Sequence, residues 1–134
     1  MTGTPGRGPP REAGAELLVL ASWEEFTDVL LGETARWPKN LRFTLTQRVE
    51  NHALDVLEKL VAARYEPGAR SVLLREINLT LERMRFLFRL AQKRGVLGAR
   101  NFERAMRGTD DAGRMVHGWR RSIERKTPRA GLPS

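Results

Sequence analysis

The sequence predicts an all-α protein: an antiparallel up-down-up-down four-helix bundle. Apolar residues recur at steps of three and four in four long segments, the spacing of amphipathic helices, and no segment shows the alternation of a strand. Turn-forming residues at Pro38, Pro67-Gly68 and Gly95 separate the segments, and short turns favour antiparallel neighbours. A chain of 134 residues fits one domain. We expect the bundle over residues 15–126, between a disordered tail at 1–14 and a flexible tail at 127–134.

The first helix is expected to begin at Ser22. Ser22 and Glu25 form the pattern of a capping box, although the run 15–21 could extend the helix backwards. The helix should end before Pro38, because the residue preceding a proline disfavours helical angles. Its expected buried residues are Trp23, Phe26, Val29 and Leu30.

The second helix is expected from about residue 41 to residue 65, where Pro67-Gly68 follows as a breaker. Between the first two helices, Trp37 should pack over the end of the bundle. The apolar face of the second helix comprises Leu45, Val49, Ala53, Val56, Leu57, Leu60 and Val61.

The third helix, expected over residues 71–94, is apolar on two opposite sides. One side is a core-facing stripe of Ile77, Leu81, Met84, Phe88 and Ala91. The other, named here the outer stripe, comprises Val72, Leu79, Phe86 and Leu90. In so short a chain, the expected cover for the outer stripe is a second copy of the chain or a partner protein. The alternative is that the helix is buried all round within its own monomer.

The fourth helix is expected over residues 99–125, with a regular core seam of Phe102, Ala105, Thr109, Ala112, Val116, Trp119 and Ile123. Opposite the seam, arginines recur every seven residues, a step that drifts by only about 20° on a straight helix. They are Arg100, Arg107, Arg114 and Arg121, and Arg125 continues the row. Glu103, Asp110 and Asp111 should weaken the middle of this row, and a plain solvated face is the alternative interpretation. Three glycines in this helix suggest a close helix approach or a local kink.

The net charge of +8 is unevenly distributed. Residues 1–69 hold eight basic and ten acidic side chains, whereas residues 70–134 hold sixteen and six. Arginine dominates, and its planar fork suits phosphate. The asymmetry indicates nucleic acid, an acidic membrane surface or an acidic protein as partner, with a basic solubilising surface as the alternative. The candidate nucleic-acid-binding residues are Arg75, Arg85, Arg89, Lys93, Arg107, Arg114, Arg121 and Arg125.

The sequence contains no recognisable catalytic set. Cysteine is absent, His52 and His117 lack a metal-ligand spacing, and there is no glycine-rich phosphate loop. We therefore expect no enzymatic activity, no cofactor and no metal. Asn78, within the third helix, could bond to a neighbouring helix, across an interface or to a nucleotide. No apolar run reaches the roughly 20 residues of a membrane span, or the length of a signal-peptide core, so a cytoplasmic protein without a membrane partner is expected.

Several short motifs, in order and with consistent gaps, resemble one bacterial family. They are Trp37-Pro38-Lys39, Arg42-Phe43-Thr44-Leu45, Arg48, Ala53-Leu54-Asp55-Val56-Leu57, Glu76-Ile77-Asn78, Leu81, Arg85-Phe86-Leu87, Arg89-Leu90-Ala91, Gly113-Arg114-Met115 and Gly118-Trp119. The chain resembles the Avd family, the accessory variability determinants of diversity-generating retroelements, over roughly residues 22–121. That family is related to four-helix proteins encoded in intervening sequences of large-subunit ribosomal RNA genes. Trp37 departs from the pattern, since the family more often has phenylalanine there.

The resemblance implies a barrel-like homopentamer of four-helix bundles with a basic surface. It also implies a non-enzymatic protein that binds a reverse transcriptase and nucleic acid, and that supports mutagenic copying of a template RNA. We accordingly expect a homo-oligomeric accessory protein whose partners are a reverse transcriptase and RNA, DNA or an RNA/DNA hybrid. The alternatives are a stand-alone protein of a ribosomal RNA intervening sequence, and a protein-binding adaptor with an acidic partner.

Overall fold

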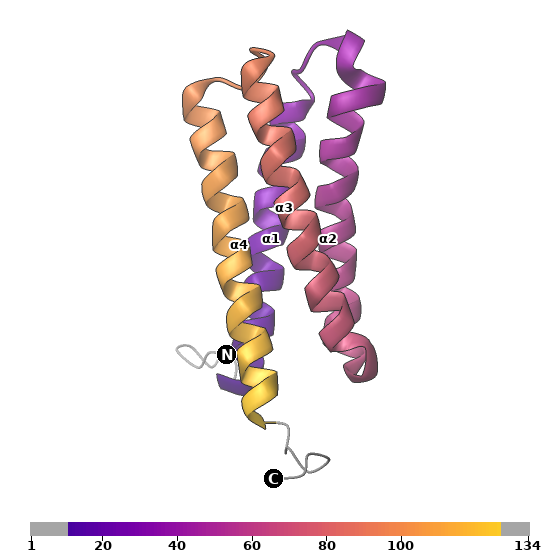
Figure 1. Ribbon diagram of the computed structural model, residues 1–134, viewed down its shortest axis with the longest axis vertical. Helices are drawn as coiled ribbons and strands as arrows, with labels where there is room; N and C mark the ends of the chain where they lie inside the picture. Colours follow the sequence, from indigo (N-terminus) through magenta and orange to yellow (C-terminus); the bar gives the residue numbers. More distant parts are fainter. Residues whose placement is uncertain (1–10, 127–134) are drawn as a thin grey trace, which may run out of the picture.

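The computed structural model describes residues 11–126, and this part of the chain forms four long helices and no strand (Figure 1). The helices are α1 (Arg11–Thr34), α2 (Gln47–Tyr65), α3 (Arg70–Lys93) and α4 (Ala99–Lys126). Two 3-10 turns, Lys39–Leu41 and Pro67–Ala69, and one π-helical turn, Arg42–Thr46, lie in the connections. The predicted all-α bundle is confirmed.

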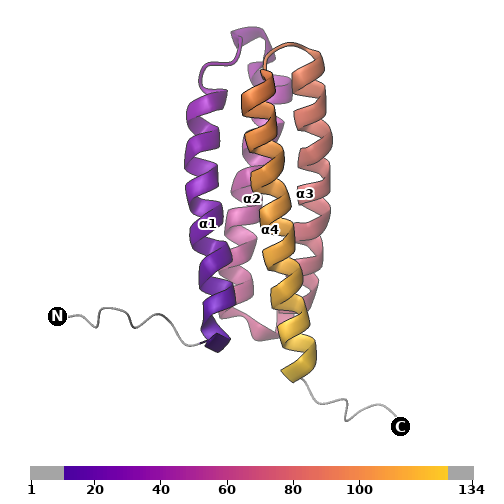
Figure 2. The ribbon, with the colours of Figure 1, turned by 90° about the vertical axis from the view of Figure 1, so that its left-hand side faces the viewer.

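The helices lie side by side along a common long axis, and their connections lie alternately at the two ends (Figures 1 and 2). The principal packing pairs are α1 with α2, α2 with α3, α3 with α4, and α1 with α4. The helices therefore follow one another around a square, with α1 diagonally opposite α3. No helix in the described part of the chain has the length and apolar character that crossing a bilayer requires.

The start of α1 differs from the prediction. The helix begins at Arg11 and runs through the proposed cap Ser22, whose side chain is exposed in mid-helix. Val19, which precedes Ser22, is fully buried. Packing of this segment against the bundle therefore extends the helix toward the N-terminus, past the residue at which the local capping signal would start it. Residues 11–14, expected in the N-terminal tail, belong to α1, whereas 1–10 and 127–134 lie outside the described residues.

The start of α2 and two expected core residues also differ. The α-helix begins at Gln47 rather than near residue 41, because the preceding turns are 3-10 and π-helical. Val29 and Val61 are 45% and 41% exposed, because the neighbouring helices cover them only in part; Val29 lines a hollow between α1 and α4. Trp37 is buried, as predicted.

The core faces of α3 and α4 agree with the predictions. All five residues of the α3 core stripe are buried, and the α4 seam is buried except for its half-buried ends, Phe102 and Ile123. Gly95 ends α3 with φ 78°, a left-handed conformation that glycine adopts at little cost. Two backbone hydrogen bonds cap the C-terminal end of α3: the Gly95 amide donates to the Gln92 carbonyl at 3.0 Å, and the Val96 amide donates to the Ala91 carbonyl at 3.1 Å.

Gly108 permits a close approach between α4 and α1. A Cβ atom there would lie 2.3 Å from two ring atoms of Phe26, so any larger residue would collide with this ring. Phe26 packs on Trp23, with ring centroids 4.7 Å apart, and Trp23 Nε1 donates a 2.9 Å hydrogen bond to the Ala53 carbonyl on α2. Since α4 is continuous over Ala99–Lys126, the glycine signal reflects close packing here rather than a helix break.

Candidate nucleic-acid interface

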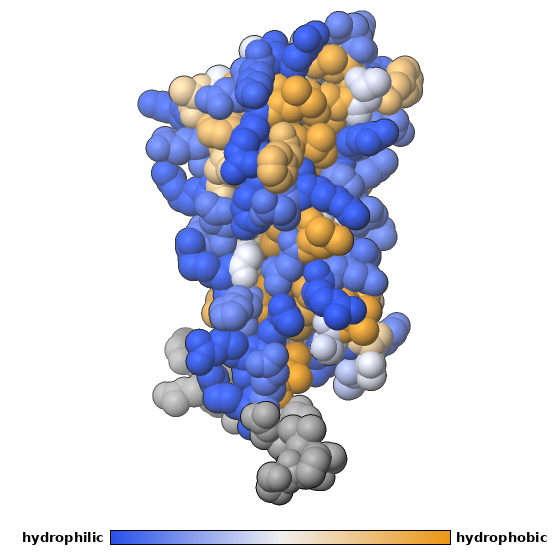
Figure 3. Space-filling view, viewed as in Figure 1, coloured by the Kyte–Doolittle hydropathy of each residue, from blue (hydrophilic) through white to orange (hydrophobic). Residues whose placement is uncertain are grey.

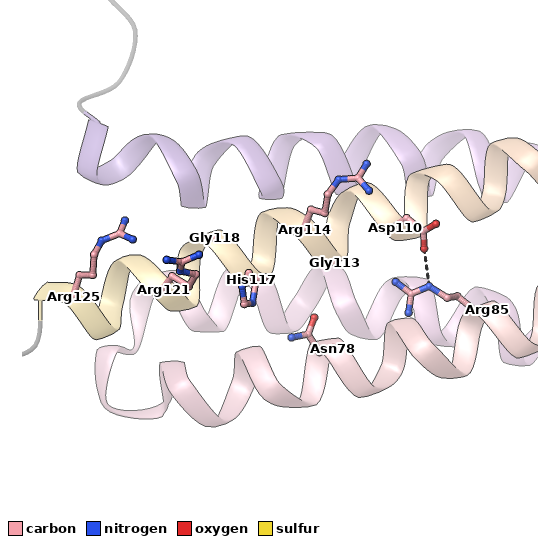
Figure 4. Close-up of a pocket in the computed structure, with 9 residues that line it drawn as sticks. All are labelled: Asn78, Arg85, Asp110, Gly113, Arg114, His117, Gly118, Arg121 and Arg125. Carbon is pink, nitrogen blue, oxygen red and sulfur yellow. Dashed lines mark hydrogen bonds and ion pairs between the residues drawn. The ribbon is translucent and has the colours of Figure 1, made fainter.

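An open groove of about 770 Å³ runs between α3 and α4 (Figure 4). The seam and the core stripe hold the two helices together on their inner sides, and the residues beside those stripes line the groove. The lining residues are Asn78, Arg85, Asp110, Gly113, Arg114, His117, Gly118, Arg121 and Arg125. Four of the predicted anion-binding arginines therefore lie along one groove.

Arg85 is held by two carboxylates. Its Nε donates to Asp110 Oδ1 on α4 at 2.7 Å, and its Nη1 donates to Glu82 Oε1 on α3 at 2.7 Å. The side chain is half-buried, and Figure 4 shows its link to Asp110. Because two carboxylates offset its single charge, Arg85 adds no net positive charge to this end of the groove, and it links α3 to α4.

The middle of the α4 arginine row is weakened, as the sequence indicated. Arg114 pairs with Asp111 one turn earlier, and Figure 4 shows its side chain directed away from α3. The i,i+4 pair between Glu103 and Arg107 is not formed in the described structure, so Arg107 keeps its charge uncompensated at short range.

The other predicted cations differ in their availability. Five of them are exposed and have no carboxylate of the described residues within ion-pair distance: Arg75, Lys93, Arg107, Arg121 and Arg125. The guanidinium of Arg89 lies over the Phe86 ring, 4.8 Å from its centroid, and remains exposed. Six of the eight predicted residues thus present an uncompensated charge to solvent.

The outer stripe of α3 is exposed. Val72, Leu79, Phe86 and Leu90 are 48%, 53%, 60% and 46% exposed. Figure 3 shows apolar residues gathered over α3 with hydrophilic residues around them. The alternative that this helix is buried all round in its own monomer is therefore wrong, and the stripe is available to another molecule.

Sequence reasoning gave little weight to three residues that line the groove: His117, Gly113 and Gly118. His117 is exposed and lies seven residues after Asp110, another groove residue. The seven-residue step that relates the arginines of α4 could therefore have identified His117 as a groove residue. Asn78, which the sequence left open between a neighbouring helix, an interface and a nucleotide, is half-buried and faces α4. No hydrogen-bond partner for its amide is present among residues 11–126.

Two further polar residues are structural. Arg70 donates to the carbonyls of Ala63 at 2.6 Å and Arg64 at 2.8 Å, the C-terminal carbonyls of α2, and lies over the Trp119 ring. His52 is half-buried on α2, and its pKa is lowered, first by burial and then by the nearby charge of Arg83. Among the described residues, no three His, Asp or Glu side chains are grouped in a way that could hold a metal ion.

Comparison with known proteins identifies the family. A family model described as bAvd-like matches residues 17–123, which is most of the chain and all of the groove except its last arginine. Searches of curated proteins and of solved structures find no match. The chain therefore belongs to the bAvd-like family.

Proposed function

We propose that this chain is a non-enzymatic, cytoplasmic nucleic-acid-binding accessory protein of a diversity-generating retroelement. It would bind the reverse transcriptase together with template RNA or cDNA, and so support mutagenic retrohoming. Membership of the bAvd-like family supports the retroelement context. The observation that carries the nucleic-acid part is the set of exposed, uncompensated arginines on α3 and α4.

The charge differs between α1 and the pair of helices α3 and α4. Helix α1 has one basic and six acidic side chains, whereas α3 has six and two, and α4 eight and four. A polyanion approaching α3 and α4 would meet an excess of positive charge, while the α1 side would repel it. This asymmetry would orient a phosphate backbone on the α3–α4 side and leave the α1 side for other contacts.

We further propose that antiparallel up-down-up-down bundles of this chain assemble into a ring. The exposed outer stripe supports this, because burying its four apolar side chains against a sibling copy would remove them from water. Arg75, Arg89 and Lys93 flank the stripe, so assembly would bring guanidinium groups from neighbouring copies together. Five copies per ring is the number that the family resemblance implies.

The test of nucleic-acid binding is the dependence of affinity on salt. If the protein neutralises phosphates, the logarithm of the binding constant for RNA should fall linearly with the logarithm of salt concentration, by about 0.7–0.9 per phosphate. The double variant Arg121→Gln/Arg125→Gln should then reduce the slope by about 1.4–1.8. A wild-type protein whose binding is insensitive to salt would refute the proposal.

The matched control is Arg42→Gln/Arg48→Gln. Both arginines are exposed and unpaired in the described structure, and the control removes the same charge from the α2 side. Its slope should stay close to that of the wild type. Equal losses in the two double variants would mean that net charge alone, rather than the α3–α4 side, governs binding.

The partner assignment has its own test. The reverse transcriptase encoded beside this gene should co-purify with the chain and increase its retention of template RNA. A neighbouring ribosomal RNA gene with no reverse transcriptase would favour the intervening-sequence alternative. An acidic protein that binds the α3–α4 side, and that RNA cannot displace, would favour the adaptor alternative.

A further inference from the structure

The centre of the α3–α4 groove contains hydrogen-bonding groups that the protein does not use. The Asn78 amide has two donors and an acceptor oxygen, is half-buried, and is directed toward α4 in Figure 4 without a bonding partner in the described chain. Asparagine is mildly unfavourable within a helix, and the Asn78 amide, which is not among the fully buried atoms that lack a hydrogen bond, is open to a ligand in the groove. A ligand that fills the groove would satisfy it.

Across the groove, α4 has no side chain at two positions. A Cβ atom on Gly118 would meet nothing within 4 Å, so no packing contact in the protein requires glycine there. At Gly113 a Cβ atom would lie 3.2 Å from Arg85 Nη2, a tight contact that a flexible side chain can relieve. Glycine within a helix costs about 1 kcal/mol relative to alanine. The gap at Gly118 lets another molecule approach the α4 backbone closely.

The groups around this gap differ along the groove. Towards α4's C-terminal end lie Arg121 and Arg125, both exposed and uncompensated, whereas Arg85 at the other end is neutralised by its two carboxylates. Between them, His117 offers two ring nitrogens and a ring face. An occupant should therefore be anionic at one end, and polar and flat in the middle.

We propose that the groove seats one unpaired nucleotide of a single-stranded RNA. Arg121 and Arg125 hold the two phosphates that flank it, Asn78 and His117 hydrogen-bond its sugar or base edge, and the base lies against the α4 backbone at Gly118. The axes of two packed helices are about 8–10 Å apart, so a groove between them is narrower than a base-paired duplex. Such a groove admits a single splayed nucleotide but not a duplex. This inference rests on the proposed nucleic-acid function and adds that binding is not purely electrostatic.

The experiment measures fluorescence anisotropy of a short unstructured oligoribonucleotide and of an RNA duplex of equal length, across a salt series. The variants are Asn78→Leu, which keeps the side-chain size, and Gly118→Leu, which fills the gap. Matched controls are Asn51→Leu and Gly32→Leu, exposed helical positions outside the groove, and a Cβ atom on Gly32 would likewise meet nothing within 4 Å. Helical circular dichroism shows whether each variant folds, and Gly118→Leu tests the groove even if Asn78→Leu does not fold.

Both groove variants should weaken single-strand binding by about tenfold while leaving the salt slope and the duplex affinity unchanged. The controls should match the wild type. Gly118→Leu with unchanged single-strand affinity would overturn the inference, and equal losses for strand and duplex would also overturn it. Neither result would alter the salt slope, on which the proposed function depends, so the two failures are distinguishable.

Discussion

Replacing Gly108 by alanine tests the closest helix contact in the bundle. A Cβ atom at this position would lie 2.3 Å from both Cδ1 and Cε1 of Phe26, well inside the roughly 3.5–4.0 Å at which carbon atoms attract. The ring would have to move by about 1 Å or more to restore that separation. It cannot move freely, because it packs on Trp23, which is 1% exposed and hydrogen-bonded to α2.

The expected magnitude follows from two opposing terms. Overpacking of this kind costs about 1–3 kcal/mol, whereas alanine in place of glycine within a helix gains about 1 kcal/mol. Gly118→Ala on the same helix makes the same chemical change in open space, so it should show only the gain. The difference between the two variants isolates the contact with Phe26, and it should be about 1–3 kcal/mol in unfolding free energy.

The measurement is urea unfolding of both variants at one protein concentration, because association would otherwise shift the midpoint. The m-value should stay constant, which would show that stability rather than compactness has changed. Adding Phe26→Leu to Gly108→Ala should recover part of the loss. Equal effects of the two glycine substitutions would show that α1 and α4 are not in close contact at Gly108.

Three further predictions concern assembly, pH and a structural arginine. Replacing Phe86 and Leu79 by glutamate should give smaller particles in light scattering, because the outer stripe would then carry buried charge; a wild type that is monomeric at micromolar concentration would refute the assembly. The pKa of His52 is lowered from 6.5, so the folded state resists protonation of this side chain, and the free energy of unfolding should fall as pH decreases below about 6.5. His52→Asn should flatten this part of the dependence of unfolding free energy on pH. Arg70→Met should lower the free energy of unfolding in urea by about 1–3 kcal/mol, because two α2 carbonyls lose their hydrogen-bond donor. The same variant should leave the salt slope of RNA binding unchanged, and a reduced slope would show that Arg70 contacts phosphate.

Charge pairing, rather than position in the arginine row, decides which cations can meet a ligand. Arg114 and Arg121 are one heptad apart on the same face of α4, yet Arg114 pairs with Asp111 and Arg121 has no acidic partner in the described chain. Variants at Arg114 and Arg121 should therefore differ in their effect on RNA affinity. Treating the row as uniform would hide this difference.

Residue spacing alone is enough to predict the helical class, the core faces of α3 and α4, and the second apolar side of α3. The reason is that the 3.6-residue turn of a helix fixes which side chains share a side. Spacing assigns Ile77, Phe88 and Val116 to the core, and all three are fully buried. Gly95 is likewise recognisable as a helix end, since few other residues adopt the left-handed conformation there.

What lies opposite each of these faces depends on how the helices pack. Periodicity assigns a residue to a direction but does not say which side chain meets it across a helix interface. For this reason spacing predicts Val29 and Val61 in the core, although both are exposed, and the local capping signal starts α1 at Ser22, although burial of Val19 extends the helix. The bond from Arg85 to Asp110, and the position of the unused Asn78 amide in the groove, depend on α3 and α4 being adjacent, which no local pattern encodes.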